Sequence, residues 1–195
     1  NFNFGYDVTD VLAAKYPDRR AMLWISEQGE EKTVSFGDVS RESSRAAAML
    51  SSLGLKKGDK CMIILKRRFE FWYIIIALHK LGVTAIPATN QLAAKDIAYR
   101  LNAAGINGII ALNDCQLLDE ADKSFSAYTS PLLKICIGCH REGWLDYYEE
   151  LEKAPEFVRP AEVNKNSDTM LLYFTSGTTG MPKMVTHDYT YPLAH

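Results

Sequence analysis

The chain has no hydrophobic run long enough to cross a membrane, and neither sign of charge is in excess. Its longest apolar run, residues 71–78, is far shorter than the ~20 residues that a transmembrane helix needs. Lysine and arginine total 22 against 24 acidic residues, so the net charge is −2 and no basic field attracts nucleic acid. No basic and apolar leader opens the chain. We therefore expect a cytoplasmic protein with reduced thiols, no membrane span and no nucleic-acid partner.

Cysteine and histidine are scarce, with four residues of each. Cys136 and Cys139 begin the run CIGCH, which formally matches a haem-attachment pattern. Zinc would need two more ligands at similar spacing, and Cys61 and Cys115 are remote in sequence. The favoured interpretation is the end of a buried strand that turns at Gly138. A redox or metal protein that uses the cysteine pair is kept as an alternative class.

Catalytic signatures of several common enzymes are also absent. The sequence has no GxSxG elbow and no Ser-His-Asp arrangement, and no two histidines have the i, i+4 spacing of a helical metal site. We therefore predict no catalytic residue and no metal ligand within these 195 residues.

What is present is an alternation of helical and extended patterns in a chain of ordinary globular composition, 47% apolar and 24% charged. Helices are expected over residues 7–16, 70–81, 93–104 and 144–151, and from a capping box at Ser35 and Asp38 to Gly54. A hairpin is expected over residues 21–26 and 32–36. Further strands are expected over residues 60–65, 84–87, 108–112, 132–137 and 169–174. Strands separated by helices predict an α/β fold, a parallel-rich sheet flanked by helices. A subdomain boundary is expected near residues 153–168.

The last predicted strand runs into a loop rich in hydroxyls and glycine. Glycines allow positive φ and a close approach of the backbone to a ligand, and successive N–H groups form a concavity that binds anions. The spacing is not that of a Walker A loop, because the lysine does not directly follow the second glycine. Ligands of parallel sheets gather at the carboxyl ends of strands, so a polyphosphate site is predicted here. Its candidate binding residues are Thr175, Ser176, Gly177, Thr178, Thr179, Gly180, Pro182 and Lys183.

The run YFTSGTTGMPKMVTH, which starts at Tyr173, resembles the phosphate-loop signature of the AMP-forming, adenylate-forming ligases. The segments PATNQL from Pro87 and DIAYRL from Asp96 resemble the branch of medium-chain, benzoate and short-chain acyl-CoA synthetases. The resemblance implies a ligase that activates a short- or medium-chain carboxylic acid. Such an enzyme uses ATP and Mg²⁺ to form an acyl adenylate, and then coenzyme A to form the thioester.

The resemblance also implies segments that have no counterpart in this sequence. The family's adenine and ribose contacts, its hinge and its carboxy-terminal catalytic lysine are missing. We therefore expect residues 1–195 to be a truncated amino-terminal adenylation domain that is inactive alone and binds ATP weakly. A helix is expected after the loop, with His187 orienting the loop or capping that helix. A stand-alone nucleotide- or phosphate-binding module and a peptide-synthetase adenylation domain remain alternatives.

Overall fold

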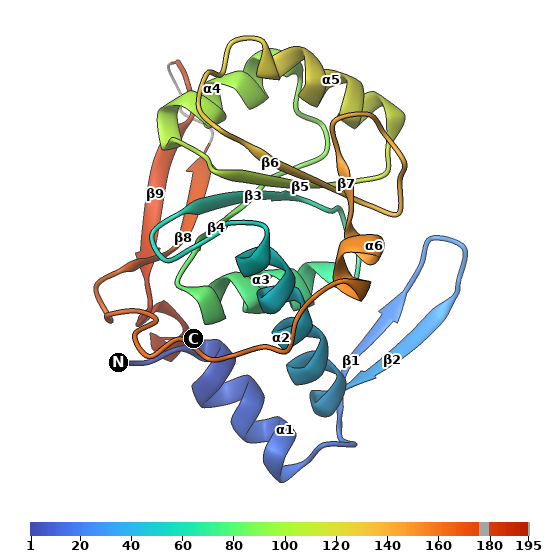
Figure 1. The fold of residues 1–195 in the computed structure, drawn as a ribbon, viewed down its shortest axis with the longest axis vertical. Helices are drawn as coiled ribbons and strands as arrows, with labels where there is room; N and C mark the ends of the chain where they lie inside the picture. The colour runs from blue at the N-terminus through green and yellow to red at the C-terminus, as the bar shows by residue number, and fades with distance from the viewer. Residues whose placement is uncertain (176–179, 195) are drawn as a thin grey trace.

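The computed structural model describes residues 1–175 and 180–194. Its centre is a seven-stranded sheet in the order β7-β6-β5-β3-β4-β8-β9, with helices on both faces (Figure 1). The strands are, in chain order, β3 (Lys60–Ile64), β4 (Thr84–Pro87), β5 (Gly108–Leu112), β6 (Leu133–Ile137), β7 (Leu145–Asp146), β8 (Thr169–Thr175) and β9 (Lys183–Asp188). The predicted α/β fold with a parallel-rich sheet is confirmed.

The strand pairs of this sheet are parallel, except that β8 and β9 are antiparallel. The carboxyl ends of β3, β4, β5, β6 and β8 therefore lie along one edge. Residues of β3 and β5 are almost all buried, as expected where helices cover both faces and strands read as continuous apolar runs. This edge is where a ligand site of such a fold is expected.

Two helical layers cover the sheet. The helices are α1 (Val11–Lys15), α2 (Phe36–Ser52), α3 (Glu70–Leu81), α4 (Ala94–Ala104), α5 (Cys115–Phe125) and α6 (Tyr147–Glu152). Helices α2 and α3 pack on one face, and α4 and α5 pack on the other (Figure 1). Alternate residues of one strand enter different cores: Ile63 packs with α2 and α3, whereas Ile64 packs with α4 and α5. The period of two along a strand explains this division.

The helix ends are set by the residues that the sequence offers there. Ser35 and Asp38 form the predicted capping box at the start of α2, and the backbone N–H of Ser35 holds the pKa of Asp38 down at about 2. Gly82 and Gly105 end α3 and α4 with φ of 73° and 63°. A left-handed residue at a helix end places backbone N–H groups where they bond the last carbonyl groups, and glycine adopts this conformation without steric cost.

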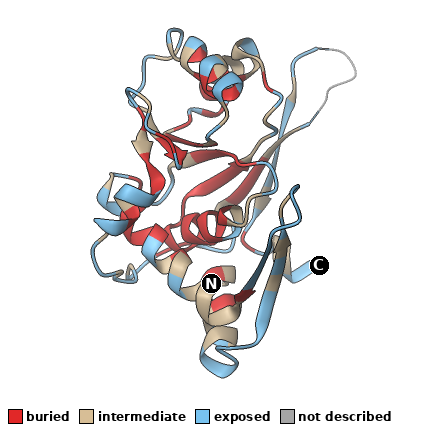
Figure 2. Ribbon diagram, turned by 90° about the vertical axis from the view of Figure 1, so that its right-hand side faces the viewer, coloured by how far each residue is buried: buried red, intermediate tan, exposed pale blue. Residues whose placement is uncertain are grey.

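The amino-terminal region lies beside this core. A π-helix, η1 (Phe4–Asp10), continues into α1, so the helical segment starts earlier than the predicted residue 7. The hairpin of β1 (Arg20–Ile25) and β2 (Glu31–Ser35) forms a separate two-stranded sheet. Figure 2 shows that most of the hairpin is exposed or half-buried, whereas buried residues concentrate in the main sheet and α3. No helix among the described residues is long and apolar enough to span a membrane.

Three elements differ from the predictions. Helix α5, capped by Asp114 through the N–H of Leu117, was not predicted at all. The helix predicted over residues 144–151 starts only at Tyr147, because Leu145 and Asp146 pair with β6 as β7. The helix predicted after the loop is wrong: strand β9 stands there, followed by a short 3-10 helix, η2 (Tyr191–Ala194).

His79 on α3 is a buried histidine of the core. Its residue is 5% exposed and neither ring nitrogen has a hydrogen-bond partner within residues 1–175 and 180–194. The ring of Tyr189 packs edge-on against it, with the centroids 6.1 Å apart. Burial disfavours the charged imidazolium and lowers the pKa of His79 to about 4.

This depressed pKa predicts an acid-sensitive fold. Between about pH 6.5 and 4, His79 is protonated in the unfolded state but neutral in the folded state, so stability falls as the pH falls. His79 should therefore lower the free energy of unfolding by about 3 kcal/mol when the pH falls from 7 to 4. We expect His79→Leu to reduce the pH dependence of the free energy of unfolding by about that amount, measured by urea unfolding at each pH. Identical slopes for parent and variant would contradict the assignment.

Candidate functional site

The candidate phosphate loop joins β8 to β9, and the antiparallel residue pair nearest to it forms its base. Thr175 is the last residue of β8 and lies directly opposite Lys183, the first residue of β9. The Thr175 hydroxyl donates to the carbonyl oxygen of Lys183 at 3.4 Å. The pairing therefore holds a hydroxyl and an ammonium side chain at the two ends of the same loop. Four predicted binding residues lie outside the described part of the chain: Ser176, Gly177, Thr178 and Thr179.

The exit arm of the loop, residues 180–183, has a glycine with positive φ and an exposed lysine. Gly180 has a φ of 128°, in the region that favours glycine. The side chain of Lys183 is exposed, and no carboxylate of the described residues lies within ion-pairing distance of its ammonium group. Lysine is a compact and mobile point charge. Lys183 is therefore a cation at the mouth of the loop whose charge is not neutralised by a described neighbour.

The loop leaves the sheet at the edge where the parallel strands end. Strand β8 is parallel to β4, so Thr175 lies at the same edge as the segment that follows Pro87. A hollow of about 370 Å³ opens beside that segment, between it and the first turns of α5. Asn90, Gln91 and Glu120 are among its lining residues. The position agrees with the predicted placement of the loop.

Two of the three segments that carry the family resemblance meet in space. Tyr99, from the DIAYRL segment on α4, donates its hydroxyl proton to the carbonyl oxygen of Pro182 at 2.9 Å. The two residues are 83 positions apart. Tyr99 was not among the predicted site residues, and no spacing in the sequence indicates this contact.

The helix-capping role predicted for His187 is wrong, and its role in orienting the loop stays a prediction. It lies within β9 opposite Leu171, and its ring packs against Tyr191 with the centroids 4.1 Å apart and against Tyr173 at 5.8 Å. There is no helix at this position for it to cap. His187 therefore contributes aromatic packing to the far part of the hairpin.

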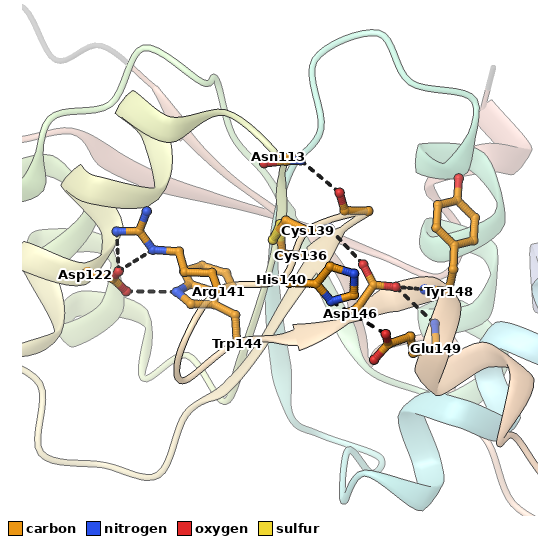
Figure 3. Close-up of a disulfide and its surroundings, with 11 residues drawn as sticks. Asn113, Asp122, Cys136, Cys139, His140, Arg141, Trp144, Asp146, Tyr148 and Glu149 are labelled. Atoms are coloured by element: carbon orange, nitrogen blue, oxygen red, sulfur yellow. Dashed lines mark hydrogen bonds and ion pairs between the residues drawn. A yellow bond between two sulfur atoms is a disulfide. The ribbon is translucent and has the colours of Figure 1, made fainter.

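The alternative site around Cys136 and Cys139 is a structural turn. Figure 3 shows the two cysteines joined by a disulfide at the end of β6, and both residues are buried. The prediction of reduced thiols is wrong for this pair. The turn has its predicted glycine, since Gly138 has a φ of 67°. The backbone N–H of Cys139 donates to Asp146, which also caps α6 (Figure 3).

The surroundings of this turn do not form a metal or haem site. His140 is exposed and lies 3.6 Å from the Glu149 carboxylate (Figure 3). Asp122 accepts from Arg141 and from the indole of Trp144. No group of three or more histidine, cysteine, aspartate or glutamate side chains among the described residues could hold a metal ion. The disulfide and its neighbours therefore stabilise the turn between β6 and α6.

The disulfide predicts a definite thiol count. Protein purified without reductant and then denatured should show two reactive thiols, those of Cys61 and Cys115, and four after reduction. In the native state only Cys115 should react readily, because burial raises the pKa of the Cys61 thiol. Labelling with a maleimide and mass spectrometry measures both counts. The denatured double variant Cys136→Ser/Cys139→Ser should give two thiols both before and after reduction. Four thiols in denatured, unreduced parent protein would contradict the pairing.

Comparison with known proteins adds a family and a set of relatives. A family model described as "AMP-binding enzyme" matches residues 10–194. The mouse protein "Acyl-coenzyme A synthetase ACSM4, mitochondrial" is 36% identical over 194 residues, which cover 96% of this chain and 33% of the relative. The rat protein "Acyl-coenzyme A synthetase ACSM5, mitochondrial" is also 36% identical, and the match covers 95% of this chain and 33% of the relative. Human ACSM1 is 35% identical, over 96% and 33%.

These relatives set the scale of the match and correct one prediction. The chain spans about a third of the length of the curated relatives that it matches. The cytoplasmic location predicted from the sequence is wrong, because the names of these relatives describe mitochondrial proteins. That prediction used the lack of a leader at Asn1, and such a lack carries no information in a chain that does not begin with methionine.

Proposed function

Because this chain belongs to the AMP-binding enzyme family, we propose that the complete protein that carries it is an AMP-forming acid–CoA ligase. The observation that carries the proposal is the pair Thr175–Lys183 at the base of the loop between β8 and β9. It places the Thr175 hydroxyl and the exposed Lys183 ammonium at the two ends of one loop, at the carboxyl edge of a parallel sheet. The similarity to acyl-coenzyme A synthetases over nearly the whole chain supports the same reaction class.

The proposed first step explains why these residue types are needed. A carboxylate oxygen attacks the α-phosphorus of ATP, the acyl adenylate forms, and the bond to pyrophosphate breaks. Two negatively charged reactants must meet, and negative charge grows on the departing pyrophosphate. Lys183, the Thr175 hydroxyl and the predicted donors Ser176, Thr178 and Thr179 would bind the β- and γ-phosphates and stabilise that charge.

The residues present fit Mg²⁺ only as an ion held chiefly by the nucleotide. No three-member acidic or histidine cluster exists in the described part of the chain, and Mg²⁺ commonly uses one or two carboxylates together with substrate phosphates and water. When bound, the ion would neutralise part of the phosphate charge. The charge that this chain itself supplies at the loop is that of Lys183.

The second proposed step transfers the acyl group to the coenzyme A thiol and releases AMP. We propose that residues 1–195 form the amino-terminal part of an adenylation domain, with a subdomain boundary near residues 153–168. The adenine, ribose and acyl contacts would then come from other parts of the complete protein. The carboxylic acid is proposed to be of short or medium chain length, as the resemblance of the PATNQL and DIAYRL segments implies. The location is proposed to be mitochondrial, which the names of the relatives state for those proteins.

The test of this function is ATP–pyrophosphate exchange by the complete protein across a panel of short-chain, medium-chain and aromatic carboxylates. We expect exchange that requires an acid and needs no coenzyme A, because the adenylate forms before the thiol acts. Binding of ATP with no acid-dependent exchange would contradict the proposal and favour a nucleotide-binding module without catalysis.

A further inference from the structure

One side chain of α4 contacts both arms of the candidate phosphate loop. The hydroxyl of Tyr99 donates to the Pro182 carbonyl on the exit arm at 2.9 Å. Its ring packs edge-on against Phe174 on the entry arm, with the centroids 6.1 Å apart and the planes at 70°. Figure 1 shows α4 next to the ends of β8 and β9 from which the loop leaves. Tyr99 therefore links both arms to a helix outside the hairpin.

The helix that carries Tyr99 is a firm support. Ile97 and Leu101 of α4 are fully buried in the core beneath the sheet. Arg100 is 9% exposed, and its guanidinium carbon lies 5.1 Å from the centroid of the Phe174 ring. Phe174 thus contacts two consecutive side chains of the same helix. A partner of this kind holds its position because its own side chains are locked by packing.

The hydrogen bond acts on the backbone next to Lys183. The Pro182 carbonyl belongs to the peptide group that leads into Lys183, and the proline ring fixes φ of its own residue. With the carbonyl held by Tyr99, the peptide plane that leads into Lys183 is also held, and the pairing of Lys183 with Thr175 sets the rest of its backbone. Lysine has a long and flexible stem, so a fixed starting point limits the volume that its ammonium group samples.

We propose that Tyr99 is a positioning residue for the polyphosphate site, which it serves by orienting the peptide group between Pro182 and Lys183. This inference rests on the proposed function of the loop. Charge stabilisation is most effective when donors and cations are already in place before the reaction. Tyr99 contacts no reacting atom in this scheme and acts only through the loop that it holds.

Tyr99→Phe in the complete protein tests the proposal, because it removes the hydroxyl and keeps the ring against Phe174. We expect kcat/KM for MgATP in pyrophosphate exchange to fall about tenfold, since small misplacements at a reaction centre have effects of this order or larger. The KM for the carboxylate should stay within a factor of about two, since the carboxylate is not bound by this arm.

Tyr128→Phe is the matched control. Its hydroxyl donates to the Ile106 carbonyl at 2.6 Å, so the same kind of bond is lost from another half-buried tyrosine. Ile106 precedes β5 and lies at the opposite edge of the sheet from the loop. We expect the thermal unfolding midpoints of the two variants to shift alike, and only Tyr99→Phe to change kcat/KM for MgATP.

The outcomes separate this inference from the function on which it rests. Equal kinetics for Tyr99→Phe and Tyr128→Phe, together with a large loss for Lys183→Ala, would overturn the role of Tyr99 and leave the ligase intact. Unchanged exchange in Lys183→Ala would overturn the proposed phosphate site itself. A Tyr99→Phe variant whose carboxylate KM rises as much as its ATP KM would show a general structural effect and would also overturn the positioning role.

Discussion

Replacing Lys183 by alanine in the complete protein is expected to slow adenylate formation by ~10²-fold or more, as removal of one preorganised charge-stabilising group does elsewhere. The exposed ammonium group has no described carboxylate partner to neutralise it, so its charge is available to the departing pyrophosphate. The effect should appear in kcat, because the negative charge grows in the transition state. The initial rate of ATP–pyrophosphate exchange at saturating acid measures it.

The control for this variant is an exposed lysine that has no part in the loop. Lys153 at the end of α6 is exposed and pairs with the half-buried Glu150 at 2.7 Å, and ion pairs at the surface contribute little. Lys153→Ala should therefore keep exchange within a factor of about two of the parent. A Lys183→Ala rate in that same range would remove Lys183 from the site.

Gly82→Ala is expected to produce the largest loss of stability among single glycine replacements at helix ends. Gly82 has a φ of 73°, and an added Cβ would lie 2.5 Å from the carbonyl oxygen of Val163. The left-handed backbone alone costs roughly 1–2 kcal/mol for a residue with a Cβ. Because a backbone carbonyl cannot rotate away, the chain at residue 163 must also move, and we expect a total of about 3 kcal/mol or more.

Gly105→Ala isolates the part of this cost that comes from the contact. Gly105 ends α4 with a φ of 63°, and nothing lies within 4 Å of an added Cβ. Gly105→Ala should therefore lose only roughly 1–2 kcal/mol. Urea unfolding of both variants gives the two free energies. Equal losses would contradict the inference that the segment at Val163 packs tightly across the end of α3.

The elements best predicted from sequence are those whose signals are local. The bounds of α3, β4 and β5 agree with the predicted ones, because each is a buried run that ends at a clear break. Gly82 ends α3 for a steric reason that any sequence displays. The capping box at Ser35 is equally local, since its two hydrogen bonds join residues three positions apart.

The elements that could not be predicted depend on distant partners. Most residues of β9 are exposed, so the strand has no alternating apolar pattern, and only its pairing with β8 makes it extended. The two residues of β7 are likewise a strand only because β6 lies beside them. Helix α5 did have a local signal, because Leu117, Leu118 and Ala121 form a buried stripe behind the Asp114 cap.

The candidate site shows the same division. The loop residues and their phosphate chemistry stay a prediction from the sequence. The described ones, Thr175, Gly180, Pro182 and Lys183, lie at the two ends of the loop that joins β8 and β9. The contact between Tyr99 and Pro182 joins residues 83 positions apart. A hydroxyl that meets a backbone carbonyl leaves no trace in residue types or spacing, so only the structure shows what holds the loop.

The most direct measurement of the central claim is the identity of the nucleotide product. The complete protein should be incubated with ATP, Mg²⁺, coenzyme A and an acid that supports pyrophosphate exchange, and the products separated by chromatography. We predict that AMP, pyrophosphate and the acyl-CoA thioester form in equal amounts, and that no AMP forms when the acid is omitted. Formation of ADP and phosphate with the thioester, or AMP formed independently of the acid, would contradict an AMP-forming acid–CoA ligase.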